Sequence, residues 1–464
     1  MKHLLLLLAF MLPVAATAFE VDGIYYDVND NEAVVISSPS SNRYSGDVVI
    51  PATVTYGGTT YPVTSIDRDA FYKCSDMTSI AIPGSITSIG YAAFNQCDGL
   101  TSVYITDLEA WFGITFSNFD SNPLTYAHHL VLNGEVVSDL VVPASVTAIH
   151  DYVFEDCTDL TSVTIHDNVT KIGSYAFNNC TGLVSVTIGD GVTWIGDDAF
   201  CGCTALTSIA IPNSVVYIGY EAFCGCSSMT EAILGNHVDE IGDFAFFECT
   251  NLTSINIPNS VTTICHGAFC GCSSLTDLTI PNSVTFIGPI AFSACSSLTS
   301  VIIPNSLTSL SEGLFGGCSA LATVTIPSTV TEIGGWAFDG CSAMTGIYCW
   351  AQEPPMAFST TFGECYGATL YVPVDAVESY LQADYWKNFS RIQTVPPAGD
   401  VDGDGMLNIN DVTMLIDTIL SGNVETINFE TADLNSNGRL DIEDVTSLIT
   451  ILLLHNSIPF PLPG

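Results

Sequence analysis

Hydrophobic and polar positions follow a pattern that repeats every 23 residues along most of this chain. Each unit is marked by a phenylalanine followed three residues later by a cysteine, and this spacing holds without a break from Phe154 to Phe338. With that phenylalanine as position 1, further apolar residues recur at positions 4, 7, 10, 12, 16, 19 and 23. A fixed period of this length predicts a solenoid, in which each unit forms one coil that stacks on the next.

Two extended segments are predicted in each coil. Positions 10 and 12 are apolar and alternate with small residues at positions 9 and 11, which is typical of a half-buried β-strand. Positions 16 and 19 predict a second short extended segment, and Pro212 to Ser214 illustrate the corner between the two. A lone coil buries too little surface to offset its ordering entropy, so stability must come from stacking and from hydrogen bonds between coils.

Glycine recurs at position 20, as in Gly196 and Gly219, and suggests a tight corner there. His150, Cys265 and Ser311 occupy the same position in other coils. A positive φ angle is therefore not strictly required at this corner.

The period is interrupted between Phe94 and Phe154, which lie 60 residues apart. Residues 107–112 read as a helix with Asp107 as its N-cap, and strand-like alternation resumes at 130–142. We interpret about 106–145 as one coil with an insertion. Such an insertion either carries binding surface or splices two parts of the solenoid, and we prefer the splice.

The start of the chain has the features of a secretory signal peptide. Lys2 is followed by an apolar run and by the sequence Ala16-Thr17-Ala18, a small-residue cleavage site, so we assign residues 1–18 to this signal. No other apolar segment is long enough to suggest a membrane-spanning helix.

Both ends of a solenoid expose core and strand edges and need caps. We predict an N-terminal β cap over 19–65, the solenoid itself over 66–348, and a C-terminal cap and linker over 349–396. Within the C-terminal cap, 368–373 reads as a last strand and 374–385 as a short helix.

The repeated sequence Ala-Phe-x-x-Cys-x-x-Leu-x-x-Val-x-Ile-Pro-x-Ser-Val-x-x-Ile-Gly resembles the BspA-type leucine-rich repeat of bacterial surface and secreted proteins. The resemblance covers about Ile66 to Tyr348. It implies a parallel-stranded solenoid that binds a protein ligand, with adhesion to host or neighbouring-cell proteins as the family's activity. It implies no catalytic residues.

Eleven of the 17 cysteines occupy position 4. A disulfide framework is usual in exported proteins, but stacked side chains that point the same way have poor geometry for pairing. We therefore expect a ladder of buried free thiols. Cys201 and Cys224 lie at equivalent positions one coil apart and could pair, whereas Cys-x-Cys at 201/203 could suggest a metal but lacks the spacing of zinc sites. The state of the off-ladder cysteines is left open: Cys201, Cys224, Cys265, Cys270, Cys349 and Cys365.

Charge excludes several classes of partner. The net charge is −41, and Lys171 is the only Lys or Arg between Phe154 and Tyr348. Nucleic acids, anionic membranes and polyanionic sugars need basic patches, so no nucleic-acid partner is expected.

The outward positions 9 and 11 form a smooth face of small, neutral, polar side chains. At position 18, Trp194 and Tyr217 either contact a ligand or pack across coils.

Catalytic motifs are missing from the sequence. His128 and His129 are adjacent, but the chain has neither His-x-x-x-His nor Gly-x-Ser-x-Gly. Carboxylates are plentiful without being concentrated in one place, and the repeats suggest no irregular cleft. We expect that this protein is not an enzyme.

Two acidic loops begin 33 residues apart and match the 12-residue calcium loop, which takes ligands from positions 1, 3, 5, 7, 9 and 12 with glycine at position 6. The predicted ligands are Asp400, Asp402, Asp404, Met406, Asn408 and Asp411 in the first loop, and Asp433, Asn435, Asn437, Arg439, Asp441 and Asp444 in the second. Met406 and Arg439 would contribute backbone carbonyls. An apolar helical stripe follows each loop, made of Val412, Leu415, Ile416, Ile419 and Leu420, and of Val445, Leu448, Ile449, Leu452 and Leu453. The pattern predicts two Ca²⁺ ions in EF-hand-like loops.

This duplicated loop and helix resembles a type I dockerin over about 399–455, and we assign 397–464 to a small α-helical calcium-binding module. The resemblance implies calcium-dependent folding and a cohesin-like partner. The family's docking residues, often a Ser-Thr pair, stand at loop positions 10 and 11. Here these positions hold Ile409-Asn410 and Ile442-Glu443, which departs from that pair.

Two hypotheses for function follow. The first is a secreted or cell-surface, non-enzymatic adhesion protein whose solenoid binds an extracellular protein and whose dockerin-like module serves attachment or assembly. The alternative is a carbohydrate-active enzyme component on a solenoid scaffold, which would place the chain in polysaccharide metabolism. A groove with converging carboxylates favours the alternative, and a smooth Ser/Thr face favours adhesion.

Overall fold

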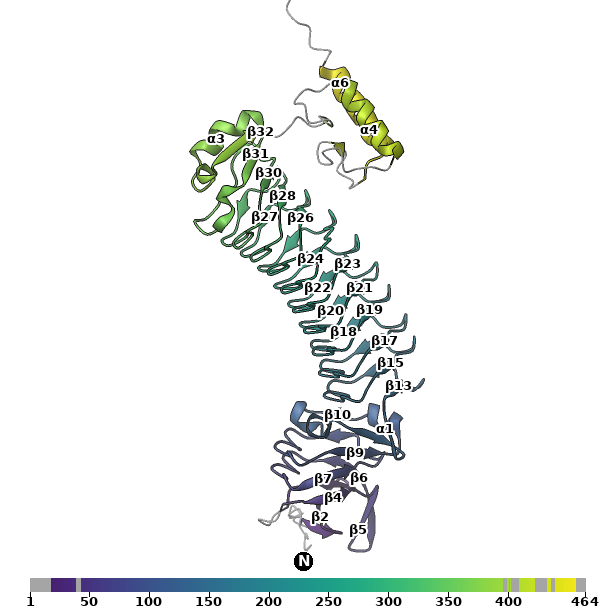
Figure 1. Ribbon diagram of the computed structural model, residues 1–464. Coiled ribbons are helices and arrows are strands. Elements are labelled where there is room, and N and C mark those ends of the chain that lie inside the picture. The colour runs from purple at the N-terminus through teal and green to yellow at the C-terminus, as the bar shows by residue number, and fades with distance from the viewer. Residues whose placement is uncertain are drawn as a thin grey trace, which may run out of the picture.

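The structure is a computed structural model that describes residues 18–38, 43–394, 399, 401, 409–421, 432–434 and 439–455. All but the last residue of the expected signal peptide, 1–18, lie outside the described residues. From residue 18 to 394 the chain winds into an elongated, curved stack of coils (Figure 1).

The regular coils contribute one strand to a main face and a shorter strand to a second face, except the coil that begins at Phe269, which forms only the second-face strand. The main-face strands are β4 (Gly46–Val49), β7 (Met77–Ala81), β9 (Ser102–Ile105), β11 (Leu130–Leu132), β13 (Asp139–Val141), β15 (Ser162–Thr164), β17 (Ser185–Thr187), β19 (Ser208–Ala210), β21 (Glu231–Ile233), β23 (Ser254–Asn256), β26 (Ser300–Ile302), β28 (Thr323–Ile326) and β30 (Gly346–Cys349). The second-face strands are β6 (Thr59–Ile66), β8 (Ser88–Ile89), β10 (Thr115–Phe116), β14 (Ala148–Ile149), β16 (Lys171–Ile172), β18 (Trp194–Ile195), β20 (Tyr217–Ile218), β22 (Glu240–Ile241), β24 (Thr263–Ile264), β25 (Phe286–Ile287), β27 (Ser309–Leu310) and β29 (Glu332–Ile333).

The register between neighbouring strands equals the sequence period. Ser162 pairs in parallel with Ser185, and Trp194 with Tyr217, so each coil position stacks on the same position of the next coil. Threonine hydroxyls also link neighbouring coils outside the strand pairs. For example, the Thr193 hydroxyl donates to the Thr170 carbonyl, 23 residues earlier, at 3.1 Å. The solenoid predicted from the period, and the parallel strands that the family resemblance implies, are confirmed.

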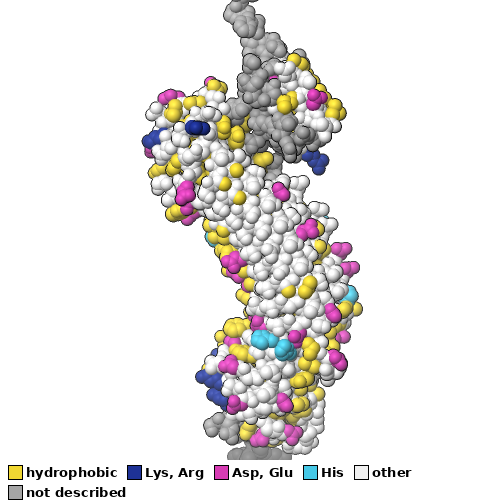
Figure 2. Space-filling view, viewed as in Figure 1, with side chains coloured by type: hydrophobic (Ala, Val, Ile, Leu, Met, Phe, Trp, Pro, Cys, Tyr) yellow, Lys and Arg dark blue, Asp and Glu magenta, His cyan; other side chains and the backbone are white. Residues whose placement is uncertain are grey.

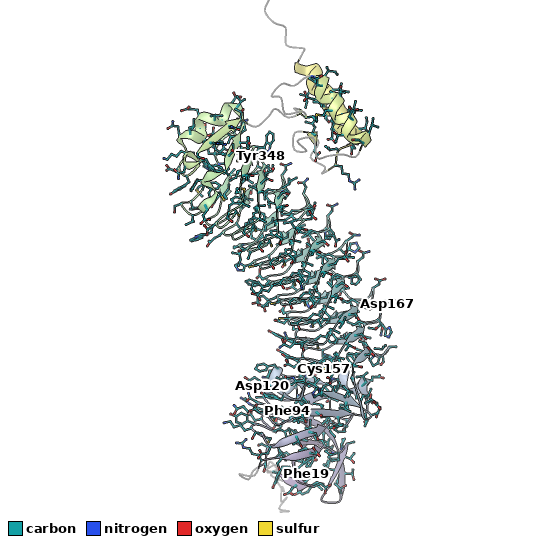
Figure 3. The ribbon with its side chains drawn as sticks, in the orientation of Figure 1. Phe19, Phe94, Asp120, Cys157, Asp167 and Tyr348 are labelled. Carbon is teal, nitrogen blue, oxygen red and sulfur yellow. The ribbon has the colours of Figure 1, made fainter. Side chains whose placement is uncertain are left out.

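Phenylalanine at position 1 forms a continuous column in the core. From Phe154 to Phe338, successive rings stack with centroids 5.3 to 6.0 Å apart, and the column ends on Phe362 at 6.3 Å. Figure 3 places Cys157 at the start of the regular coils and Tyr348 near their end. All position-4 cysteines are buried, and the Cys203 thiol donates to the Phe177 carbonyl at 3.2 Å.

The insertion joins two parts of the solenoid. Its elements are α1 (Leu108–Phe112), η1 (Phe119–Ser121), α2 (Leu124–Ala127) and β12 (Glu135–Val136), which forms a hairpin with β11. As predicted, the Asp107 side chain caps α1, accepting from the Ala110 N–H at 3.0 Å. Trp111 is buried and donates to the Val153 carbonyl at 3.0 Å, while Phe112 packs edge-on against Phe154. These contacts support the splice interpretation.

Both ends of the stack carry additional strands or short helices. At the N-terminal end, β1 (Phe19–Val21), β2 (Ile24–Asn29), β3 (Glu32–Val35) and β5 (Thr53–Tyr56) include antiparallel pairs. At the other end, β31 (Thr369–Val372) and β32 (Arg391–Thr394) extend the main-face sheet in parallel. Short helical turns lie around them: η2 (Gly363–Gly367), η3 (Val374–Ala376), α3 (Val377–Gln382) and η4 (Trp386–Asn388).

The helix predicted over 374–385 is wrong in its length. Only 377–382 is α-helical, because the chain breaks to bury two aromatic side chains. The Tyr380 hydroxyl donates to the Ala351 carbonyl at 2.9 Å, and Trp386 Nε1 donates to the Pro355 carbonyl at 2.7 Å. Tertiary contacts here override local helix propensity.

Two further helices, α4 (Ile409–Ser421) and α6 (Ile442–His455), pack against each other around Val412, Leu415, Val445 and Leu448. Both helices were predicted from the apolar stripes. The two stripes meet only in part, since Ile416, Leu420 and Ile449 are exposed. One line of side chains on each helix is enough to fill this small core, and the flanking residues face outward.

Candidate calcium loops and binding surfaces

The two predicted loops share one structural feature at position 12. Asp411 is fully buried, and its Oδ1 accepts the Val401 N–H at 2.8 Å. Asp444 is equally buried, and its Oδ1 accepts the Leu434 N–H at 3.0 Å. In both loops the position-12 carboxylate therefore ties the helix to position 2 of its own loop.

The second loop is further ordered by its own acids. Asp444 Oδ2 accepts the Asp441 N–H at 2.9 Å, and Asp441 Oδ1 accepts the Glu443 N–H at 2.8 Å. Burying a carboxylate is costly without compensating charge or hydrogen bonds, and a bound Ca²⁺ would supply the charge. The hard oxygen ligands of this set suit that ion.

The structure describes five of the twelve predicted ligands: Asp411, Asp433, Arg439, Asp441 and Asp444. The other seven lie outside the described residues: Asp400, Asp402, Asp404, Met406, Asn408, Asn435 and Asn437. The ligand roles of all twelve residues stay a prediction.

An exposed apolar face marks the start of each helix. Ile409 is 70% exposed and Ile442 is 71% exposed, and both stand at loop position 10. Ile416 and Ile449 follow seven residues later, on the same side of their helices, and are also exposed. The two halves of the module thus present equivalent pairs of exposed isoleucines.

The outer side of the main strands carries mostly small, uncharged side chains. At position 11 this row is interrupted by exposed Val141, Ile233 and Ile302. On the face shown in Figure 2, acidic side chains are scattered, and Lys and Arg lie towards the two ends. Rigid strands therefore hold isolated apolar side chains at fixed spacings, and exposed Asp139 and Glu231 share β13 and β21 with two of them.

The aromatic pair at position 18 lies on the second face. The Trp194 and Tyr217 rings stack with centroids 4.1 Å apart, and Trp194 remains 42% exposed. The stacking supports the interpretation that these rings pack across coils.

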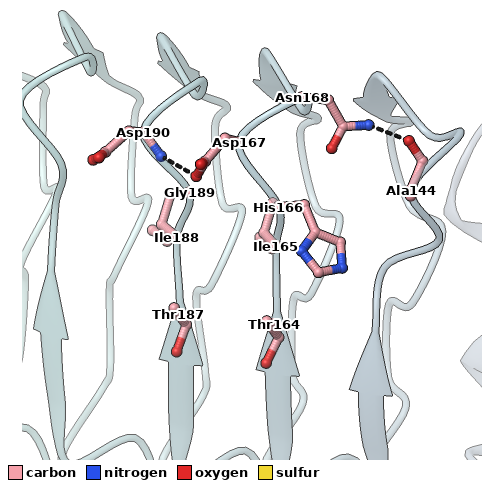
Figure 4. Close-up of a pocket in the computed structure, with 10 residues that line it drawn as sticks. All are labelled: Ala144, Thr164, Ile165, His166, Asp167, Asn168, Thr187, Ile188, Gly189 and Asp190. Atoms are coloured by element: carbon pink, nitrogen blue, oxygen red, sulfur yellow. Dashed lines mark hydrogen bonds between the residues drawn. The ribbon is translucent and has the colours of Figure 1, made fainter.

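The structure also contains an open depression of about 640 Å³ that the repeat pattern did not predict. It lies beside the corners of successive coils, and its lining includes His166, Asp167 and Asp190 (Figure 4). Asp167 accepts the Asp190 N–H at 3.0 Å, and Asn213 makes the equivalent bond to Asn236 at 2.8 Å. This carboxylate therefore has the same coil-linking role that asparagine has elsewhere, which does not point to catalysis.

Comparison with known families accounts for both parts of the chain. The model of the BspA type leucine rich repeat region matches in six copies, over residues 59–126, 132–239 and 216–345, which together make up more than half of the chain. The chain belongs to the BspA-type leucine rich repeat family. A second family, the dockerin type I domain, matches residues 398–453. Among curated proteins, no significant match was found.

Several solved structures resemble this BspA-type protein. A leucine rich cell surface protein from Faecalibacterium prausnitzii A2-165 is 27% identical, with a TM-score of 0.51 over 81% of this chain and 97% of that one. A leucine-rich repeat protein from Bacteroides ovatus ATCC 8483 is 26% identical, with a TM-score of 0.44 over 71% and 94% of the two chains. The pneumococcal vaccine antigen PcpA is 16% identical, with a TM-score of 0.49 over 82% and 99%.

BspA-type repeats and dockerins are typically non-catalytic modules that bind other proteins, and dockerins typically bind calcium. In the part of the chain that the structure describes, no helix is long and apolar enough to cross a membrane. The repeat pattern did not predict side-chain contacts between coils, such as those that line the depression. The pattern of one coil does not show which of its side chains contact those of the next coil.

Proposed function

We propose that this BspA-type chain is a secreted or cell-surface adhesion protein without catalytic activity. The observation that carries the proposal is the mostly uncharged outer side of the main strands with its exposed Val141, Ile233 and Ile302. Isolated apolar anchors on a rigid polar surface suit a protein ligand, because few buried contacts usually provide most of the binding energy. The lack of basic side chains on the regular coils disfavours polyanions as ligands.

The dockerin module attaches the solenoid to a partner through its exposed isoleucines. Ile409 and Ile442 occupy the positions at which the family binds cohesins, and Ile416 and Ile449 extend the same two faces. Such a patch fits a cohesin-like partner with an apolar docking surface. Two Ca²⁺ ions, held by the twelve predicted ligands, order the helices that carry the patch.

The solenoid proposal is tested by capturing ligands from extracellular and cell-surface protein extracts with the full chain. Ile233→Glu combined with Ile302→Glu should abolish capture, because charges cannot be buried unpaired at the ligand interface. The matched control combines Val216→Glu with Phe286→Glu, which places the same two charges at exposed apolar residues in or next to the second-face strands β20 and β25. Equal capture by both variants would contradict a ligand site on the main face.

The docking proposal is tested with a panel of type I cohesin domains, with calcium and with chelator. Ile409→Asp combined with Ile442→Asp should abolish calcium-dependent binding. Val374→Asp combined with Leu381→Asp, an equal change at two exposed residues of η3 and α3, should leave it unchanged. Calcium-independent binding, or binding by the isoleucine double variant, would contradict docking through these faces.

A further inference from the structure

Two off-ladder cysteines occupy the same coil position on adjacent turns. Position 2 holds Asn178, Cys201, Cys224, Phe247 and Cys270 in five successive coils, so only Cys201 and Cys224 place thiols on neighbouring coils within this run. Both are half-buried, in contrast to the fully buried ladder cysteines Cys203 and Cys226 that follow them. These thiols are therefore accessible from solvent.

The backbone holds the two turns side by side. Asp198 N–H donates to the Tyr220 carbonyl at 2.7 Å, Phe200 N–H to the Ala222 carbonyl at 2.8 Å, and Gly202 N–H to the Cys224 carbonyl at 2.8 Å. Three bonds within five residues leave little freedom for the segments that carry the thiols. The geometry of this cluster is consequently set by the stack itself.

A carboxylate completes the cluster. The thiol sulfurs of Cys201 and Cys224 and a carboxylate oxygen of Glu221 all lie within 4.8 Å of one another. Tetrahedral zinc, with bonds of about 2.3 Å to sulfur and about 2.1 Å to oxygen, places its ligand atoms roughly 3.5–4 Å apart. Small side-chain rotations would bring these three atoms to that spacing.

Neighbouring groups support the three side chains from outside. The Tyr220 side chain is hydrogen-bonded to Glu221. Asp198 is hydrogen-bonded to both Tyr175 and Cys201. Hydrogen-bonding partners of this kind orient metal ligands and tune their basicity.

The charges at the cluster favour a cation. Asp198 and Glu221 both lie close enough to Cys201 to interact with it, and no Lys or Arg lies between Lys171 and Lys387 in the sequence. A divalent ion would offset the charge of the thiolates that it binds.

We propose that Cys201, Cys224 and Glu221 form a zinc site on the surface of the solenoid, with water as the fourth ligand. Two thiolates and one carboxylate match the borderline-soft character of Zn²⁺ and leave one coordination position open. The sequence motif Cys-x-Cys is not the ligand pair, because Cys203 donates into the core to the Phe177 carbonyl. The pairing runs across coils, between residues 23 positions apart.

Binding exchanges protons for the ion. Each thiol loses its proton when its sulfur bonds to zinc, so one Zn²⁺ displaces two protons and no oxidant or reductant takes part. Calorimetric titration in buffers with different ionisation enthalpies should therefore give a release of about two protons. A release near zero would overturn the proposal.

The decisive experiment uses Co²⁺ as a spectroscopic substitute for Zn²⁺ on the full, reduced chain, with excess Ca²⁺ to fill the dockerin loops. We expect one Co²⁺ per chain, a thiolate-to-cobalt charge-transfer band, and displacement by Zn²⁺. Cys201→Ser and Cys224→Ser should each remove the band and weaken binding by about 100-fold or more. Tyr220→Phe should weaken binding about tenfold.

The matched control is Cys270→Ser. Cys270 stands at the same coil position and is also half-buried, but its neighbours at that position are Phe247 and Ser293. This variant should bind Co²⁺ like the wild-type chain. An unchanged band in Cys224→Ser, or the absence of any thiolate band in the wild type, would overturn the site. Mass-spectrometric detection of a Cys201–Cys224 disulfide in the protein as exported would also overturn it, because that bond consumes both ligands.

Discussion

At the scale of single residues, Glu155 is unusual because it is a carboxylic acid buried in the stack of coils. It stands at position 2 of the first regular coil and is only 6% exposed. Among the described residues, Oε2 has no hydrogen-bond partner. Burial raises the pKa of Glu155 to about 8, and the charges of Asp156, Asp120 and Asp198 add to the shift. The folded protein therefore favours the protonated carboxyl.

We expect this carboxyl to make stability depend on pH. The folded pKa of about 8 lies above the ordinary value of 4.5, so the stabilisation is complete below pH 4.5 and is lost as the pH rises to about 8. Glu155→Gln keeps the neutral form. It should exceed the wild type in free energy of unfolding by on the order of a few kcal/mol at pH 8, with little difference near pH 4.

Urea unfolding across this pH range measures the effect. The control is Asp339→Asn, because Asp339 occupies the same coil position and is exposed. The prediction fails if both variants shift stability with pH to the same extent.

Ladder cysteines are protected by both burial and hydrogen bonding. Burial raises the pKa of Cys203 to about 12, and its thiol donates to the Phe177 carbonyl. Because the thiolate is the reactive form, an alkylating reagent should leave Cys203 unlabelled in the native protein and label it after denaturation without reductant. Half-buried Cys270 should react in the native state. Mass spectrometry identifies the labelled residues, and disulfides among the position-4 cysteines would contradict the ladder.

Glycine at position 20 shows what a residue pattern leaves undecided. No positive φ angle is found at Gly196, yet an added Cβ would lie 2.6 Å from the Ser174 nitrogen of the adjacent coil. Close approach between coils, rather than a special turn, explains this glycine. The left-handed residues are at positions 22 and 3, as at Tyr175 and Asn179. Position 22 holds varied side chains and carries no clear signal, whereas position 3 is glycine in five coils, a signal that our prediction did not use: Gly202, Gly225, Gly271, Gly317 and Gly340.

At the scale of elements, the insertion contains one feature that the sequence predicts, helix α1, and one that it does not predict, the contact made by Trp111. Helix α1 and its Asp107 cap follow from local sequence, because an N-cap acts within three residues. The contact of Trp111 with the Val153 carbonyl joins residues 42 positions apart. Local pattern carries no information about that contact, because it depends on how the interrupted coils stack.

Trp111→Ala should weaken the junction between the two parts of the solenoid. The change removes a fully buried ring and leaves the Val153 carbonyl without this donor, so we expect a loss of about 3–5 kcal/mol in the free energy of unfolding. Urea denaturation followed by circular dichroism measures the loss.

The control for the junction is Trp194→Ala. Trp194 is partly exposed and stacks on Tyr217, so its removal should cost only about 0.5–1.5 kcal/mol. A similar loss in both variants would show that Trp111 has no special role at the junction.

At the scale of the whole molecule, the two modules depend on different sources of order. Stacking of many similar coils stabilises the solenoid, and the period alone was enough to predict that the coils stack. The dockerin module has a much smaller core, centred on Val412, Leu415, Val445 and Leu448. Helix periodicity predicted the helices, but could not show which apolar residues meet and which, like Ile416, stay exposed.

Because the two modules differ in this way, we expect calcium removal to unfold the dockerin helices and to leave the solenoid intact. Asp411 and Asp444 are buried at the base of α4 and α6, and each accepts a backbone N–H from its own loop. Without a cation, the acidic side chains of each loop repel one another, and a core of this size cannot offset that repulsion. Chelator should therefore remove helical circular dichroism while the β signal persists.

Calorimetry on the full chain should give two Ca²⁺ ions, and Asp411→Ala or Asp444→Ala should each reduce the number to one. Loss of one site should also weaken the other, because α4 and α6 share one core. Asp417→Ala is the control, since this exposed acid lies in α4 outside the predicted loop and should leave both ions bound. Helices that persist in excess chelator, or a wild-type chain that binds no calcium, would show that the loops are ordered by hydrogen bonds alone.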